Sequence, residues 1–169
     1  MGLGVLIARV VLGLSMAAHG GQKLFGWFGG PGLSGVSGFV ETVGFYPPRL
    51  FAVALAVTEF GSGLLTALGL FGPIGPAGMI LVMIVAAVVV HRPNGFFAMT
   101  NGIELNLLYV TGAMFVAFAG SGPYSLDAVL GIDRIWSVQA TWVIIALGVA
   151  GAFVNLAVRR PPQAVRRAA

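Results

Sequence analysis

Charged residues are scarce in this chain of 169 residues, since only 8% are Asp, Glu, Lys or Arg, whereas 58% are hydrophobic. A soluble domain carries about 25% charged residues, because its surface has to be solvated. This chain cannot cover itself with a polar surface. The composition therefore predicts an integral membrane protein of one helical bundle, with the lipid bilayer as its main partner.

Cysteine is absent, which excludes disulfides, thiolate catalysis, iron–sulfur ligation and cysteine zinc sites. Only two histidines occur, His19 and His91. Two helices could bring them together around one haem, but no haem-protein motif surrounds either residue. No His/Glu cluster has the spacing of metal ligands. We therefore expect neither a haem nor a metal.

The formal net charge is +4, and four of the nine Lys and Arg residues lie in the last eleven positions. The positive charge therefore reflects membrane topology, and we expect no nucleic-acid partner. A basic segment of this kind commonly holds anionic lipid headgroups.

Five apolar segments are long enough to cross a bilayer core of about 30 Å, which takes roughly 20 helical residues. Four of them form a predicted membrane core within residues 1–137, at 4–25, 49–70, 73–90 and 103–119. An additional membrane helix is predicted at 138–158, followed by a basic cytoplasmic tail at 159–169. The start, MGLG, has no positive side chain, so the first segment is interpreted as a retained helix and not as a cleaved signal peptide. The predicted fold is an all-α integral membrane bundle of four helices plus a fifth.

A glycine-rich tract, GWFGGPGLSG, follows the first segment and cannot form an ordinary helix. Behind it, apolar residues at helical spacing predict a short interfacial helix at 34–44, ended by Gly44 and the Pro47-Pro48 pair. The loop at 26–48 either re-enters the membrane under cover of the bundle or stays at the surface. It lacks the preceding strand and the GK[ST] ending of a phosphate-binding loop.

The distribution of basic residues predicts the orientation in the membrane, because Lys and Arg favour the cytoplasmic side. With the N-terminus outside, only Arg134 faces out, beside Asp127 and Asp133. The inner side then holds seven cations: Lys23, Arg49, Arg92, Arg159, Arg160, Arg166 and Arg167. We predict a plasma-membrane protein with its C-terminus in the cytoplasm. A four-span arrangement, with the fifth segment peripheral, would reverse this argument.

Polar side chains gather at the predicted inner ends of the helices. His19 and Lys23 close the first segment, His91 closes the third, and Glu104 opens the fourth. Ionisable groups at membrane depth are costly and usually find a partner or a cavity. Glu104 could therefore pair with Lys23 or with His91.

Glu59 differs, because it lies near the middle of the second segment. Arg9, His19 and Lys23 share one face of the first helix, within an arc of roughly 80°. Glu59 could approach this face, and a buried Arg9–Glu59 ion pair is predicted. Such a pair either has a functional role or only fixes helix packing.

The polar inner end also permits a chemical hypothesis. A quinone needs a flat apolar slot, donors for its carbonyl oxygens, and groups that relay protons during reduction. The candidate ligand-binding residues are His19, Gln22, Lys23, His91, Asn94 and Glu104, and His19 and Glu104 are candidates for proton relay or for a hydrogen bond to the quinone. Candidate walls are Trp27, Phe28, Phe96 and Phe97, although each alone is more typical of an interfacial aromatic belt. For either histidine alone, a structural hydrogen bond is an equal alternative.

Four blocks in this order resemble the DoxX family of bacterial membrane proteins and together cover roughly residues 5–130. They are HGGQKLFG (19–26) after Arg9 and Leu12-Gly13; Glu59 with GSGLL (61–65) and LGL (68–70); NGFF (94–97) with Gly102, Glu104 and NLL (106–108); and GPYSLD (122–127). The polar positions of the family are matched by Arg9, His19, Gln22, Lys23, Glu59, Asn94 and Glu104. Two positions depart from it: Leu105 stands where the family pattern has Tyr, and Ser62 interrupts a Gly-Gly.

The resemblance implies a four-helix membrane core and an association with quinone-linked oxidoreductases. Archaeal members are named as subunits of a thiosulfate:quinone oxidoreductase, and actinobacterial members as membrane partners of soluble redox enzymes. It therefore implies a quinone as cofactor and a soluble or membrane redox protein as partner. Whether the chain is itself an enzyme, and whether it forms a homo-oligomer, is left open.

Two functions of different classes follow. The first is a membrane subunit of an oxidoreductase system that binds a quinone. The alternative is a non-catalytic scaffold or anchor that stabilises a partner. A cavity that is apolar with polar ends would separate them. A transporter is disfavoured because the chain is small and has no inverted repeat, and no selectivity-filter motif supports an ion channel.

Overall fold

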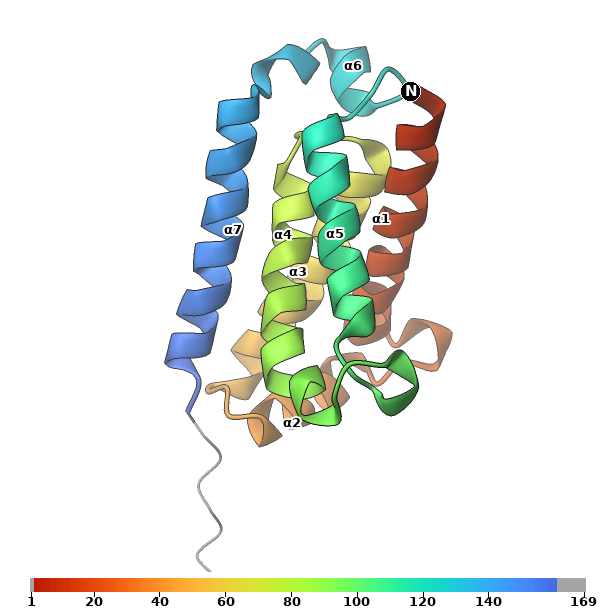
Figure 1. The fold of residues 1–169 in the computed structure, drawn as a ribbon. Coiled ribbons are helices and arrows are strands. Elements are labelled where there is room, and N and C mark those ends of the chain that lie inside the picture. Colours follow the sequence, from red (N-terminus) through yellow and green to blue (C-terminus); the bar gives the residue numbers. More distant parts are fainter. Residues whose placement is uncertain (1, 161–169) are drawn as a thin grey trace, which may run out of the picture.

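A computed structural model describes residues 2–160, and every regular element in that range is helical. Five long helices stand side by side (Figure 1). They are α1 (Gly2–Phe25), α3 (Pro48–Leu68), α4 (Ile74–Ala86), α5 (Glu104–Ala119) and α7 (Val138–Val158). The shorter elements are α2 (Gly32–Thr42), α6 (Leu126–Leu130), and 3₁₀ turns at Trp27–Gly29, Arg92–Asn94, Ala98–Thr100 and Asp133–Ile135.

Four helices are long and apolar enough to cross a membrane: α1, α3, the continuous helix Ile74–Asn94, and α7. The fifth, α5, is apolar but has only 16 residues, or about 24 Å at 1.5 Å per residue. The predicted all-α membrane fold with an extra C-terminal helix is confirmed. Most predicted helix boundaries lie within two residues of the observed ones. Of the predicted tail at 159–169, only Arg159 and Arg160 belong to the described residues.

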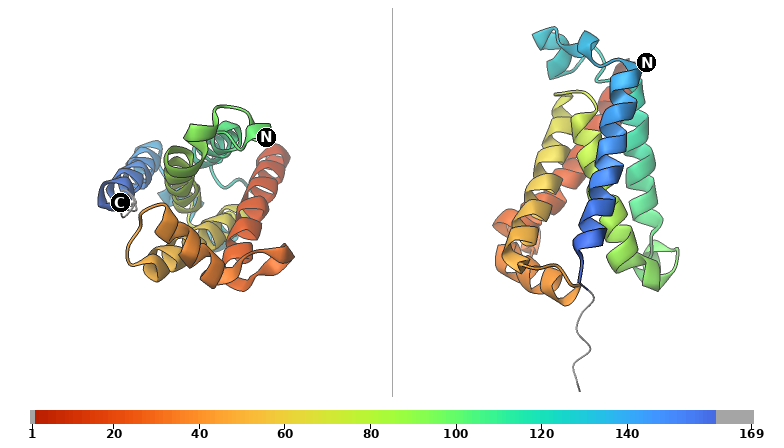
Figure 2. Two further views of the ribbon diagram at one scale, coloured as in Figure 1. Left: turned by 90° about the horizontal axis from the view of Figure 1, so that it is seen from below. Right: turned by 90° about the vertical axis from the view of Figure 1, so that its left-hand side faces the viewer.

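The two ends of the bundle differ in content (Figures 1 and 2). One end, called here the α6 end, holds the N-terminal end of α1 together with α6. The opposite end, the α2 end, holds α2 and the C-terminal end of α7. The chain termini of the bundle therefore lie at opposite ends, as five spans require.

Small residues let the long helices approach at backbone distance, which is how membrane helices commonly pack. A Cβ atom on Gly13 would lie 2.4 Å from the backbone nitrogen of Ala67, and one on Gly20 would lie 2.3 Å from that of Phe60. These contacts set an antiparallel register between α1 and α3. On the other side of the bundle, Gly148 of α7 packs against the carbonyl oxygen of Ala77 in α4.

The loop between α1 and α3 covers the α2 end of the bundle. The predicted interfacial helix is present as α2, beginning two residues earlier than expected. Val36 and Val40 are buried there against Phe45 and Ala52, whereas Glu41 on the same helix is exposed. Because its apolar face meets the helix ends, α2 lies across the bundle and does not insert between the long helices (Figure 1).

Candidate functional site: a polar-ended cavity

A cavity of about 430 Å³ lies among α1 to α5, toward the α2 end. Its volume falls in the range of small-molecule sites, roughly 300–1,000 Å³. Most of the wall is aliphatic, and Phe39, Phe45 and Tyr109 contribute aromatic rings. Its polar lining residues are His19, Lys23, Glu59, His91, Asn101, Asn106 and Tyr109. An apolar cavity with a few convergent polar groups is typical of a binding site.

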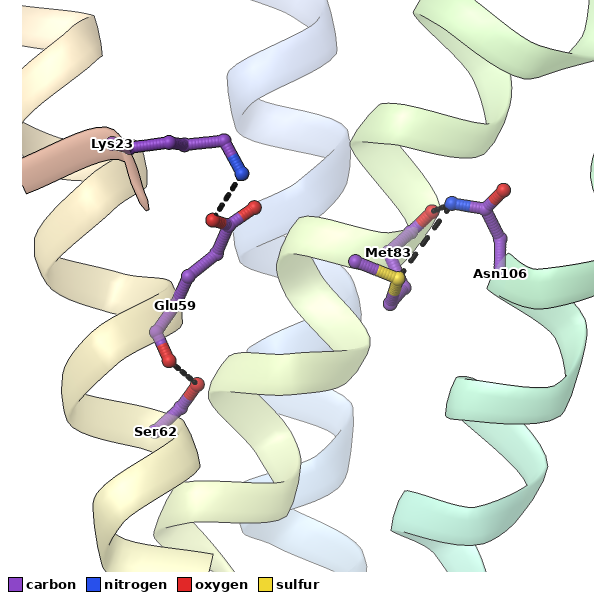
Figure 3. A network of polar contacts seen from close by, with 5 residues as sticks. All are labelled: Lys23, Glu59, Ser62, Met83 and Asn106. Carbon is purple, nitrogen blue, oxygen red and sulfur yellow. Dashed lines mark hydrogen bonds and ion pairs between the residues drawn. The ribbon is translucent and has the colours of Figure 1, made fainter. Parts of the chain in front are cut away.

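Glu59 and Lys23 form an ion pair at the cavity, with Lys23 Nζ donating to Glu59 Oε2 (Figure 3). Glu59 is only 4% exposed, and a buried carboxylate requires such a partner. Behind it, Ser62 Oγ donates to the Glu59 backbone carbonyl at 3.3 Å. The ammonium group of Lys23, in the last turn of α1, therefore reaches the carboxylate of Glu59 in the middle of α3.

The predicted Arg9–Glu59 pair is wrong, and the register of α1 against α3 explains why. Because the two helices are antiparallel, Glu59 lies beside the C-terminal part of α1, near Gly20 and Phe60. Arg9 lies 14 residues before Lys23 on α1, about 21 Å away at 1.5 Å per residue. Lys23, and not Arg9, is therefore the cation within reach of Glu59.

Arg9 belongs to a separate polar cluster at the α6 end. Its guanidinium donates to the backbone carbonyls of Ala67 and Tyr124, and it is 2% exposed. Asp127, fully buried, accepts hydrogen bonds from Phe71 N at 2.7 Å and Gly72 N at 2.8 Å, and from Ser121 Oγ at 2.8 Å. The two charges also attract each other electrostatically. This cluster joins α1, the α3–α4 turn and α6, and it has no part in the cavity.

Both histidines line the cavity. The ring of His19 meets that of Tyr109 edge to face, with centroids 6.3 Å apart. His91 Nδ1 lies 2.9 Å from the carbonyl oxygen of Asn101, and because a carbonyl only accepts, this nitrogen carries the proton. Nε2 of a neutral His91 is then a hydrogen-bond acceptor.

His91 is placed by an irregular turn of helix. The end of α4 continues as a π-helical turn, Ala87–His91, which leads directly into the Arg92–Asn94 turn. π-Helical turns are rare and frequently occur at functional sites. Val89, Val90 and His91 of this turn all line the cavity.

Three of the six predicted ligand-binding residues do not line the cavity but hold the loops around it. Glu104 Oε2 accepts a hydrogen bond from Ala98 N at 2.8 Å, so it pairs with neither Lys23 nor His91. Asn94 Nδ2 donates to Val90 O at 3.1 Å and to Asn101 O at 3.3 Å. Gln22 lies against Gly30, since a Cβ atom added to Gly30 would lie only 2.6 Å from the Cβ atom of Gln22.

Two polar cavity residues on α5 were not among the predicted ligand-binding residues. Asn106 is 4% exposed, and its Nδ2 donates to Met83 O at 3.4 Å (Figure 3). Tyr109 is the other. The signal in the sequence was their spacing, because residues three apart share one face of an otherwise apolar helix.

The four aromatic residues predicted as walls lie outside the cavity. The exposed fraction is 49% for Trp27 and Phe96, 75% for Phe28 and 65% for Phe97. Such exposure suits the alternative interpretation of these side chains as an interfacial belt. Within residues 2–160, no group of three His, Asp or Glu side chains is placed to hold a metal.

The helical bundle and its polar-ended cavity define a multi-pass membrane protein. Comparison with known families is specific: the DoxX family matches residues 4–92. The chain belongs to the DoxX family. The matched region runs from α1 to the π-helical turn and includes His19, Lys23, Glu59 and His91. No curated protein and no solved structure matches the chain.

Proposed function

We propose that this protein is a membrane subunit of an oxidoreductase system and that its cavity binds a lipid quinone. The observation that carries the proposal is the cavity of about 430 Å³ with aliphatic walls and seven polar lining residues. A quinone headgroup is flat and apolar apart from its two carbonyl oxygens, which accept hydrogen bonds. The association of the family with quinone-linked enzymes points the same way.

The polar groups of the cavity match the needs of quinone reduction. A bound quinone takes up two electrons and two protons and becomes the quinol. Lys23 Nζ, the amide of Asn106 and the hydroxyl of Tyr109 are donors for its oxygens. The two histidines are groups that can pass protons near neutral pH. The electrons come from a redox partner protein in this proposal, because cysteine ligands for an iron–sulfur cluster are absent.

The test is to extract the purified protein with organic solvent and measure bound quinone by mass spectrometry. We expect stoichiometric quinone in the wild type and at least about a tenfold loss in His19→Ala and Glu59→Gln. Glu41→Gln is the matched control, because Glu41 is an exposed carboxylate on α2 and should leave the quinone content unchanged. Absence of quinone from folded wild-type protein would overturn the proposal.

A non-catalytic scaffold is the second candidate, favoured by the structural roles of Gln22, Asn94 and Glu104. In that case the Lys23–Glu59 pair serves stability alone. Protein without bound quinone that copurifies with a defined redox partner, and does so equally in His19→Ala, would support it.

A further inference from the structure

A second hollow, of about 380 Å³, lies between α1 and α5. Its lining residues are apolar except for Ser15 and Tyr109, and Gly112 contributes no side chain. Ser15 Oγ donates to Val11 O in its own helix at 2.7 Å, so its hydroxyl needs no partner from an occupant. Apart from the hydroxyl of Tyr109, the groove offers no free polar side chain, so it suits a hydrocarbon chain.

The groove adjoins the cavity. Leu105 and Tyr109 line both of them, so these two side chains stand at the junction. Tyr109 contacts His19, another cavity residue, and lines the groove together with Gly112 and Phe115. An occupant that reaches from one space into the other therefore has to pass this pair of side chains.

The groove runs along the length of α1 and therefore along the depth of the bilayer. Along α1, the cavity is lined by His19 and Lys23 near the α2 end, and the groove by residues from Ile7 to Ser15. This is a length of about 12 Å at 1.5 Å per residue, which begins near the middle of α1 and runs toward the α6 end. Ile7 and Val11 are 55% and 63% exposed, so the groove opens sideways to lipid.

We propose that the groove between α1 and α5 holds the isoprenoid tail of the quinone whose headgroup occupies the cavity, and that it is the lateral route by which this ligand enters from the bilayer. This inference rests on the proposed function. It specifies the ligand as a long-tailed lipid quinone that enters in the plane of the membrane, with its headgroup toward the α2 end.

In this proposal the groove contributes to quinone binding by leaving room for the tail, and not by attracting it. Lipid tails around the protein are as apolar as the groove, so the isoprenoid chain gains little by leaving them. A closed groove, however, would force the tail of a seated headgroup against α1 or α5. Closing it should therefore exclude long-tailed quinones and spare a quinone that has no tail.

Gly112→Leu closes the groove without altering the cavity lining. A Cβ on Gly112 meets only the flexible side chain of Leu12, at 3.2 Å, so the fold can accommodate it. Ala8→Phe closes the groove from the α1 side as a second variant. Gly61→Leu is the matched control, because Gly61 on α3 has open space around its Cβ position and lines neither hollow.

The experiment measures the affinity of two quinones with the same headgroup, one with a long isoprenoid tail and one with a methyl group in its place, for protein in lipid nanodiscs. We expect wild type and Gly61→Leu to bind both. Gly112→Leu and Ala8→Phe should bind the long-tailed quinone at least about tenfold more weakly and the tailless quinone within about twofold of wild type.

Other outcomes separate the two proposals. If the wild type binds both quinones and the groove variants lose both equally, or lose neither, the tail lies elsewhere and only the present inference fails. Unchanged quinone binding with loss of copurified phospholipid would show that the groove holds an annular lipid. If wild-type protein binds neither quinone, the proposed function fails and this inference with it.

Discussion

At the residue scale, two buried carboxylates carry different tasks. Glu59 has one charged partner and lines the cavity, whereas Asp127 has three hydrogen-bond donors and does not line the cavity. A carboxylate whose acceptor sites are already filled by backbone amides is a structural anchor. One that keeps acceptor capacity beside an open space remains available to a ligand.

Replacement of Lys23 by Met should destabilise the protein by about 3 kcal/mol, because it leaves Glu59 buried without its cation. The double variant Lys23→Met/Glu59→Gln should recover most of this loss, since no charge then remains unpaired. Thermal unfolding in detergent measures both variants. A double variant as unstable as the single one would show that the packing of the Lys23 stem, and not the charge, is what matters.

Asp127→Asn should cost about 2 kcal/mol or more. An amide has one acceptor oxygen, so its NH₂ group would face the N–H of Phe71 or Gly72 and leave a buried donor unsatisfied. Asp133→Asn is the control, because Asp133 is exposed, and its unfolding temperature should match the wild type. Equal unfolding temperatures for both variants would contradict the anchoring role of Asp127.

The sequence indicated which polar residues gather at one end of the bundle better than it indicated which of them pair. His19, Lys23 and His91 do line one cavity, since they close neighbouring helices at one end of the bundle. The partner of Glu59 could not be predicted from its position within its own helix. It depends on how α1 slides against α3, and that register is set by the close contacts of Gly13 and Gly20.

At the scale of elements, helix existence follows from length and apolar composition, which explains why all five long helices were predicted. The π-helical turn at Ala87–His91 could not be, because its sequence, AVVVH, continues the apolar run of α4 without a break. The residues that line the groove between α1 and α5 could not be predicted either, because they depend on how two apolar faces meet.

Glycine contacts between α1 and α3 should be intolerant of even one methyl group. A Cβ on Gly20 would lie 2.3 Å from Phe60 N, and relief of this clash requires the helix backbones to separate. We expect Gly20→Ala to destabilise the protein by about 2 kcal/mol, because the separation also moves Glu59 away from Lys23. Gly4→Ala is the control on the same helix, with nothing within 4 Å, and should be neutral in thermal unfolding.

At the scale of the whole molecule, the distribution of charge between the two ends predicts the orientation in the membrane. Among the described residues, Lys23, Arg49, Arg92, Arg159 and Arg160 lie toward the α2 end, whereas Arg134 and the buried Arg9 lie toward the α6 end. Basic residues favour the cytoplasmic side. The α2 end, and with it the polar end of the cavity, is therefore predicted to face the cytoplasm, where a soluble electron donor could reach it.

The absence of cysteine from the whole chain makes this orientation directly measurable. Glu41→Cys on α2 and Gln139→Cys at the start of α7 place single exposed thiols at opposite ends of the bundle. In intact cells, a membrane-impermeant maleimide should label Gln139→Cys at once and label Glu41→Cys only after permeabilisation. The cysteine-free parent is the blank. The reverse pattern would place the polar end of the cavity outside the cytoplasm, and the electron donor would then have to be an exported protein or a membrane partner.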